Sequence, residues 1–299
     1  MAANHLAWNR YGKSRIRLVK VRRAGDRHAI VDLTLDVQLE GAFDAVYIDG
    51  DNRSCLATDT MKNTVYALAR RDPIDHVEAF GLRLADHFIA KPSVSRVLIS
   101  AVEHPWSQVA VNRETHPHAF VQSGAGDWTA SVTRDAAGAS VVSGVTNLVV
   151  LKTADSAFSG FPRDPYTTLL DTDDRILATS MTASWTYRPG TTDFSVRDAV
   201  RAALIDTFAS HTSLSVQHTL YAMGQAALAV CADITEITLT LPNRHHLLVD
   251  LQPFGLDNPN EVFVATDQPY GLIEATISRT KDPRPQTNDP RPSTKDQAP

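Results

Sequence analysis

The sequence predicts an α+β fold made of two successive copies of one unit, each an antiparallel four-stranded sheet with two helices on one face. The expected elements follow the order strand, strand, helix, helix, strand, strand, and the second half of the 299-residue chain repeats it. Strands are segregated from helices within each copy, which is typical of antiparallel sheets and not of a doubly wound α/β fold. With 43% hydrophobic residues, the chain is long enough to bury a sizeable core.

The first copy opens with a hairpin over residues 13–40. Its clearest strand is 30–40, where hydrophobic and polar residues alternate from Val31 to Glu40, so that one face is buried and the other is wet. A turn at 24–26 precedes this strand. In the strand before the turn, the alternation of hydrophobic and polar residues shifts by one position between Leu18 and Val19, which predicts a bulge. Helices are expected at 59–70 and 74–90, then extended segments at 94–102 and 120–132, the latter with a turn at 124–127.

The second copy begins with strands at 140–151 and 179–188. A helix follows from Ser195, which pairs with Asp198 in the pattern of a capping box, and a second helix spans 216–230. Strands at 234–241 and 245–251 complete the unit. We therefore divide the chain into domains at 1–135 and 136–279. The remaining 280–299 is rich in proline and lacks large aliphatic residues, which predicts a disordered tail.

Composition and charge exclude several classes of protein. A net charge of −5 and a pI near 6.1, without a large basic block, argue against a nucleic-acid partner. The longest stretch without charged residues, 207–232, holds too many polar groups for a membrane span. Cys55 and Cys231 are expected to be free thiols in a reducing compartment. Neither a signal peptide nor a C-terminal peroxisomal signal is recognised, so a cytoplasmic location is expected.

Six separated segments carry a resemblance to a known family. They are Tyr11-Gly12-Lys13, residues 57–64 (ATDTMKNT), Phe158-Ser159-Gly160-Phe161, Asp174-Arg175-Ile176-Leu177, Ser215-Val216-Gln217 and Pro242-Asn243-Arg244-His245. In this order they resemble the motifs of urate oxidase (uricase) of the bacterial type. The resemblance implies two tandem tunnelling-fold domains and a homotetramer with active sites at subunit interfaces. It also implies oxidation of urate by O2 and water to 5-hydroxyisourate and hydrogen peroxide, with no metal and no organic cofactor.

The resemblance places a proton relay at Lys13, Thr58 and His245. By itself, Lys13 would be read as a solvated cation at the start of a strand. A lysine that shares hydrogen bonds with a hydroxyl and an imidazole can instead accept a proton near neutral pH. Thr58 and Asp59 open a helix, where N-capping is the ordinary role, and the resemblance adds contact with urate from a neighbouring subunit. Thr58 is also expected to touch O2.

The remaining substrate contacts lie in the second half of the chain. Arg175 could form only a surface ion pair, but the resemblance makes it a bidentate clamp on the purine edge. Gln217, with the backbone of Val216, is expected to satisfy another edge of urate. Phe158 sits in a connection rich in Ser and Gly, where its ring could stack on the purine face or pack in the core. Asn243 is matched to the position that holds O2 or water above the ring.

Two other functions stay open on the sequence. The histidines at 104, 116, 118, 245 and 246, above all the pair in His116-Pro117-His118, could bind zinc, as in pterin enzymes of the same fold. A purine-binding module without catalysis would explain Arg175 and Gln217. It would leave Lys13 and His245 without a role.

Overall fold

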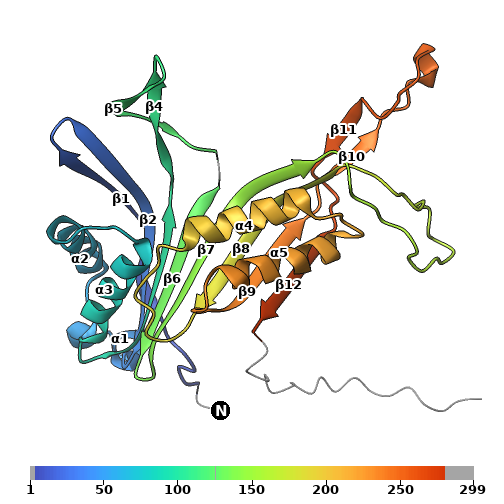
Figure 1. The fold of residues 1–299 in the computed structure, drawn as a ribbon. Coiled ribbons are helices and arrows are strands. Elements are labelled where there is room, and N and C mark those ends of the chain that lie inside the picture. The colour runs from blue at the N-terminus through green and yellow to red at the C-terminus, as the bar shows by residue number, and fades with distance from the viewer. Residues whose placement is uncertain (1–3, 125, 280–299) are drawn as a thin grey trace, which may run out of the picture.

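The computed structural model describes residues 4–124 and 126–279 and contains one continuous eight-stranded antiparallel sheet (Figure 1). Its spatial order is β1 (Tyr11–Ala24), β2 (Arg27–Gly41), β3 (Val94–Glu103), β6 (Asp127–Asp135), β7 (Gly138–Lys152), β8 (Leu177–Tyr187), β9 (Ile234–Pro242) and β12 (Leu272–Ser278). The first four strands come from the first half of the chain and the last four from the second. Residues 280–299, where a disordered tail was predicted, lie outside the described residues.

Each half of the sheet carries a pair of helices on the same face. The first pair is α2 (Thr58–Arg71) and α3 (Val77–Ile89), and the second is α4 (Arg197–Ser210) and α5 (Val216–Val230). A short α1 (Asp44–Ile48) and single turns η1 (Asn52–Ser54) and η2 (Gln252–Phe254) complete the helical segments described. This arrangement confirms the predicted α+β class with antiparallel pairing and two helices per copy.

A row of cross-strand neighbours shows that one face of the sheet is buried from edge to edge. The side chains of the row are all less than 10% exposed, and they are Ile16, Leu35, Ala101, Ala130, Ser143, Trp185, Ile237 and Ile277. Because side chains alternate between faces along a strand, the opposite face carries the polar series that includes Thr34, Asp36 and Gln38. The helices thus cover one face, and we call the other the open face.

The two halves are continuous across β6 and β7, where the sequence predicted two separate sheets. The predicted boundary between residues 135 and 136 falls in the tight turn between these strands, and their ladder is paired from Asp135↔Gly138 to Asp127↔Thr146. Arg197 of α4 reinforces the join, because it forms an ion pair with Glu103 of β3 and its guanidinium carbon lies 5.1 Å from the centre of the Trp128 ring. The division into domains stays a prediction.

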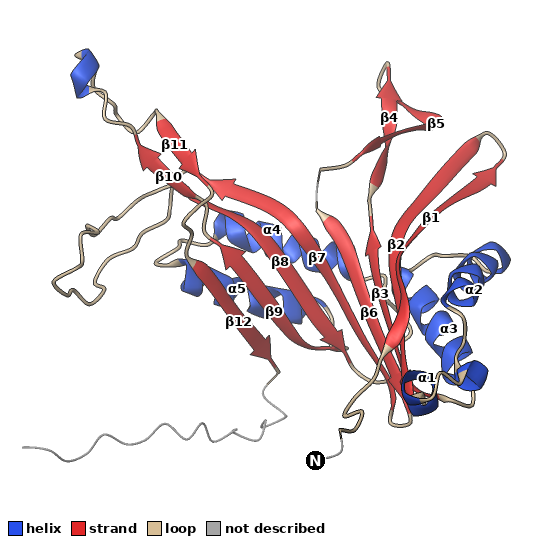
Figure 2. Cartoon of the chain, turned by 180° about the vertical axis from the view of Figure 1, so that it is seen from behind, coloured by secondary structure: helices blue, strands red, loops and turns tan. Residues whose placement is uncertain are grey.

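Two predicted strands are placed differently in the structure. Residues 245–251 do not complete the main sheet, because β10 (His245–Leu248) pairs with β11 (Phe263–Thr266) in a separate ribbon, and β12 takes the edge position beside β9. Residues 120–122 belong to β5 (Glu114–Gln122), which pairs with β4 (Trp106–Val111) in a second ribbon. Figure 2 shows both ribbons extending beyond the main strands. Burial explains the difference, since no residue of β4, β5, β10 or β11 is fully buried.

Two local predictions are also corrected. The bulge in β1 lies between Lys13 and Ile16, where Arg15 adopts a positive φ of 56° and its N–H reaches Asp36 at 2.5 Å. The capping box at Ser195 does not form, because the N-cap of α4 is Val196, one residue later, and the Ser195 N–H bonds to Asp193.

Further predictions concern the thiols and the membrane. Cys55 and Cys231 are free, as expected. Among the described residues, no helix is long and apolar enough to cross a membrane.

Candidate functional site

The first group of predicted site residues gathers where β1 and α2 begin. Gly12 holds β1 tightly against β2, since a Cβ at this position would lie 1.9 Å from the carbonyl oxygen of Val37. Lys13 follows, at the last paired position before the bulge. Thr58 and Asp59 are the first two residues of α2. We call Lys13, Thr58 and Asp59 the first cluster.

Tyr11 ties the two elements of the first cluster together. Its hydroxyl oxygen accepts a hydrogen bond of 2.9 Å from the N–H of Leu56, two residues before Thr58. Its ring stands edge-on against Phe43 at a centroid distance of 4.8 Å. Burial, and secondarily the neighbouring Cys55, raise the pKa of the Tyr11 phenol, which therefore stays neutral at ordinary pH. The sequence motif contained Tyr11, but its positioning role depends on a contact that no sequence pattern reveals.

The N-terminus of α2 is not capped by a side chain. Its N-cap residue is Ala57, so the capping role considered for Thr58 and Asp59 is wrong. Asp59 instead accepts hydrogen bonds from Lys62 at 2.5 Å and Asn63 at 2.8 Å. The bond to Lys62 is the main cause of the lowered pKa of Asp59, and the charge of Lys13 acts in the same direction. Lys13 is therefore close enough for its charge to act on the start of α2.

The second group lies around the connection between β7 and β8. This connection is fastened to the segment before α5, because Ala157 donates to the Ser213 carbonyl at 2.7 Å and Ser213 donates to the Asp155 carbonyl at 2.9 Å. Phe158 and Thr172 exchange two backbone hydrogen bonds of 2.8 and 3.0 Å across the loop. These bonds bring Phe158 to the N-terminus of α5.

Arg175 lies over the ring of Phe158, with 5.3 Å between its guanidinium carbon and the ring centroid. Its Nε is buried and has no hydrogen-bond partner. No carboxylate among the described residues pairs with it, so the surface ion pair considered from the sequence does not form. Burial lowers the pKa of the guanidinium without offsetting help from a neighbouring charge. Such a group is prepared to donate to an anionic acceptor, which none of the residues at 4–124 and 126–279 supplies.

The N-terminus of α5 faces the same region. Ser215 caps the helix by accepting a hydrogen bond of 3.1 Å from the N–H of His218. Val216 is buried and Gln217 is exposed at the first turn, where backbone N–H groups lack partners inside the helix. We call Phe158, Arg175, Val216 and Gln217, with Asn243 and His245, the second cluster.

Asn243 and His245 adjoin Arg175 through the start of β8. The backbone of Asn243 forms a bridge with Thr179, and Arg244 donates to the carbonyl of Ala178 at 2.8 Å. The side-chain nitrogen of Asn243 lies 3.4 Å from Nδ1 of His245. The Oγ1 atom of Thr179 is buried without a partner. Thr179 was not singled out in the sequence, because a threonine in a strand carries no recognisable signal.

The two clusters do not meet within one chain. The first belongs to β1, at one edge of the sheet, and the second surrounds β8, the sixth strand in spatial order. Five interstrand spacings correspond to roughly 24 Å along the sheet. The relay of Lys13 and Thr58 with His245 therefore cannot close inside a single chain.

Comparison with known proteins decides the family. The family model described as uricase matches residues 9–133 and 141–274, which include every residue of both clusters. The chain belongs to the uricase family. A uricase of Arthrobacter globiformis is 48% identical over 276 residues, covering 92% of this chain and 90% of its own length, and one of Dictyostelium discoideum is 37% identical over 278 residues, covering 91% and 96%. The resemblance read from the six motifs is confirmed.

Solved structures agree with this placement. The crystal structure of the uricase from Arthrobacter globiformis superposes with a TM-score of 0.90 at 46% identity, covering 96% of this chain and 99% of that one. A uricase structure from Bacillus fastidious, at 23% identity, has a TM-score of 0.78 and supports the fold alone.

The histidines do not converge on a metal site in this uricase. Among the described residues, no group of three or more His, Cys, Asp or Glu side chains is placed to hold a metal ion. His116 and His118 pack ring against ring at 4.6 Å, and His246 contacts the carbonyl of Arg244. His245 stands apart from them, beside Asn243.

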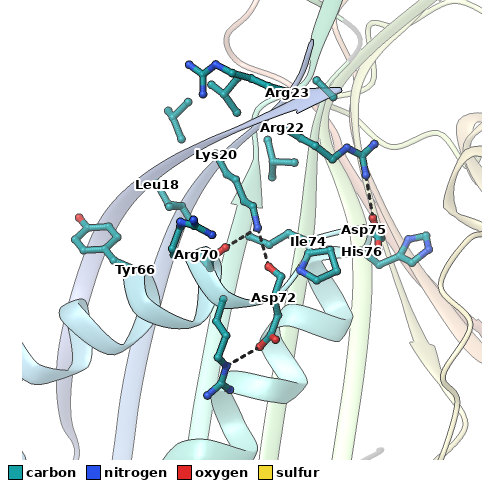
Figure 3. Close-up of a pocket in the computed structure, with 17 residues that line it drawn as sticks. Leu18, Lys20, Arg22, Arg23, Tyr66, Arg70, Asp72, Ile74, Asp75 and His76 are labelled. Carbon is teal, nitrogen blue, oxygen red and sulfur yellow. Dashed lines mark hydrogen bonds and ion pairs between the residues drawn. The ribbon is translucent and has the colours of Figure 1, made fainter. Parts of the chain in front are cut away.

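A large cavity lies away from both clusters. It has a volume of about 920 Å³ between β1 and the end of α2, and none of the predicted site residues lines it (Figure 3). Lys20 spans it and donates to the carbonyls of Ala69 and Asp72 at 2.6 and 2.7 Å, which caps the C-terminus of α2. Arg22 and Asp75 approach at 3.4 Å on its rim. These contacts fasten the hairpin of β1 and β2 to α2.

Proposed function

We propose that this protein is a urate oxidase that converts urate, O2 and water to 5-hydroxyisourate and hydrogen peroxide without a metal or organic cofactor. Membership of the uricase family supports urate as the substrate. The observation that carries the proposal is the half-buried Arg175, whose Nε lacks a partner and whose guanidinium lies over Phe158. A flat anionic heterocycle needs both features, a charge-assisted donor at its edge and an aromatic face below its ring.

Within the second cluster, Phe158, Arg175, Val216 and Gln217 would contact the edges and the face of urate. Arg175 donates two hydrogen bonds to adjacent acceptors on one edge, and the amide of Gln217 with the N–H of Val216 meets another edge. Phe158 stacks on the ring. Because Arg175 has no counterion among the described residues, the charge of the bound purine would compensate its desolvation.

Proton removal would run through Lys13, Thr58 and His245. Urate must lose a proton to become electron-rich enough to react with O2, and a chain of amine, hydroxyl and imidazole can carry that proton away from the ring. Two electrons then pass from urate to O2, which takes up the proton lost by urate and one from water and leaves as hydrogen peroxide. The hydroxide of that water adds to the ring as the new hydroxyl group. Asn243 and Thr58 would hold O2 and then water above the ring, and Thr58 and Asp59 would complete the contacts to urate.

We further propose a homotetramer in which the first cluster of one subunit meets the second cluster of its neighbour. The separation of the clusters along the sheet supports this arrangement. So do the two edges of the sheet, since β1 pairs only with β2 and β12 only with β9 among the described strands. Joining such edges between subunits would satisfy their backbone groups. A cytoplasmic location stays a prediction from the sequence.

A metal-free assay tests the activity. In the presence of a strong chelator, the near-ultraviolet absorbance of urate should fall while O2 is consumed and peroxide accumulates. Loss of activity on chelation, with recovery on adding zinc, would favour a zinc-dependent pterin-type enzyme instead. Binding of urate without O2 consumption would favour a purine-binding module.

A further inference from the structure

A second chemical site lies on the open face of the first half, away from both clusters. Thr34 of β2 places its Oγ1 2.9 Å from Nε2 of His104, which directly follows β3. Nδ1 of the same imidazole lies 3.3 Å from Oδ1 of Asp127, the first residue of β6. A hydroxyl, an imidazole and a carboxylate thus stand in line across three adjacent strands.

Arg17 and Asp127 favour one direction for the hydrogen bonds in this line. Nη1 of Arg17 donates to Oγ1 of Thr34 at 2.8 Å, and the threonine keeps its own proton to donate to Nε2 of His104. Because an ionised carboxylate only accepts, Asp127 favours the imidazole proton on Nδ1. This is the tautomer that a nucleophile, base and carboxylate triad requires.

The surroundings hold Arg17 and His104 in place. The second arm of Arg17 is bound by the carboxylate of Asp32, a residue only 6% exposed. Asp32 also accepts a hydrogen bond of 3.1 Å from the indole of Trp106, and its carbonyl accepts one of 2.9 Å from the N–H of His104. The guanidinium is therefore fixed beside the threonine oxygen by a buried carboxylate. Thr34 and Asp127 lie in paired strands, and His104, just after β3, is held by its backbone hydrogen bond to Asp32.

The reactive groups are also accessible. The side chains of His104 and Asp127 are 23% and 28% exposed, and Thr34 is partly exposed on the open face. The positive charge of Arg17, whose side chain is 50% exposed, lies where negative charge would develop on an oxygen bonded to a carbonyl carbon attacked by Thr34. Nothing in the proposed oxidation of urate uses any of these residues.

We propose that Thr34, His104 and Asp127 form an acyl-transfer site that hydrolyses small carboxylic esters, with Arg17 stabilising the oxyanion. Oγ1 of Thr34 attacks the ester carbonyl carbon and its proton passes to Nε2 of His104. The intermediate collapses, the carbon to alkoxide bond breaks, and the leaving alcohol takes that proton. Water then attacks the threonyl ester with His104 again as base, which releases the carboxylic acid and restores Thr34.

The test uses the intact protein and p-nitrophenyl acetate. Wild type should release p-nitrophenol with turnover, and peptide mass spectrometry after a rapid quench should find an acetyl group on Thr34. Thr34→Ser keeps the hydroxyl and should retain hydrolysis, whereas Thr34→Val and His104→Gln should each lower the rate by roughly 100-fold or more. Thr238→Val is the matched control, because Thr238 is also a strand threonine but its Oγ1 meets only Thr276, at 2.8 Å. Urate oxidation should be unchanged in all four variants and reports correct folding.

Several results would overturn the proposal. The proposal fails if Thr34→Val and wild type hydrolyse the ester at the same rate, or if the acetyl group is found only on lysines or other residues. If Thr34→Val does not fold, the rate of His104→Gln is compared with that of wild type instead. If wild type does not oxidise urate, that result contradicts only the function proposed above and not the ester hydrolysis proposed here.

Discussion

Replacing Arg175 with alanine is the sharpest test of the proposed urate site. In the free protein the guanidinium has a buried Nε without a partner and no ion pair among the described residues. The substitution therefore removes little from the folded chain itself, and we expect the midpoint of thermal unfolding to change little. The loss should appear in catalysis, since the bidentate charge-assisted contact with urate disappears.

The magnitude follows from the kind of contact. Two hydrogen bonds from a charged group contribute about 2 to 4 kcal/mol to transition-state binding. At 1.36 kcal/mol per tenfold change, kcat/KM should fall by roughly 30- to 900-fold. Initial rates of urate loss over a range of urate concentrations give this ratio.

Arg163→Ala is the matched control for Arg175→Ala. Arg163 belongs to the same loop and lies over Phe161 at 5.2 Å, but it is paired with Asp171 and more exposed. It should change kcat/KM less than about threefold. The reasoning is refuted if Arg163→Ala and Arg175→Ala impair catalysis equally, or if a planar purine analogue binds Arg175→Ala as tightly as wild type.

Four further outcomes are expected. Lys13→Met and Thr58→Ala should each lower turnover by orders of magnitude, and the double variant should cost little more than the worse single one; additive losses in steady-state assays would show that the two residues do not act as one unit. Inactive Thr58→Ala subunits mixed with inactive Arg175→Ala subunits, after dissociation and reassembly, should regain activity; hybrids confirmed by mass that stay inactive would place a whole site in each chain. Gly12→Ala should lower the free energy of unfolding by roughly 2 to 4 kcal/mol in urea titrations, because its Cβ would meet the Val37 carbonyl. Gly124→Ala is the control and should leave the free energy of unfolding unchanged, because a Cβ there has no heavy atom within 4 Å. Because the pKa of Tyr11 is raised on folding, the unfolded phenol ionises first, and the free energy of unfolding should fall as pH rises above the ordinary value of 10.0. Tyr11→Phe should remove that part of the decline. An unchanged slope in Tyr11→Phe would contradict the raised pKa of Tyr11.

Much of the fold could be predicted because one face of each main strand is buried. The alternation from Leu33 to Leu39 survives in the structure as buried and partly exposed positions of β2, whereas Val31 is only partly buried and Asp32 is buried. The polar ribbons could not be separated from the main strands in the same way. Residues 245–248 form a strand but none of their side chains is fully buried. The strand that completes the sheet, β12, lies a further loop away, and only its Ile277 is fully buried. The local sequence pattern does not show which of the two strands, β10 or β12, pairs with β9 at the edge of the sheet.

The predicted site residues were found through motifs, but their grouping depends on contacts between distant segments. The bond from Leu56 to Tyr11 and the bonds between residues 155–157 and Ser213 join segments 45 and about 57 positions apart, and neither pair has a complementary signature in the sequence. The same limit applies to Thr34, His104 and Asp127, which only the order β2, β3, β6 brings together.

The duplication of the fold also explains why a chain would carry one urate site and not two. The first cluster uses the N-terminus of α2, the first helix of its pair, whereas the second cluster uses the N-terminus of α5, the second helix of its pair. The internal repeat therefore does not superpose one cluster on the other, and the two halves of a chain cannot supply equivalent sites. In the proposed assembly each site takes one cluster from each of two neighbouring subunits. The number of sites then equals the number of subunits, and each interface between neighbours contributes to catalysis as well as to covering the edges of the sheet.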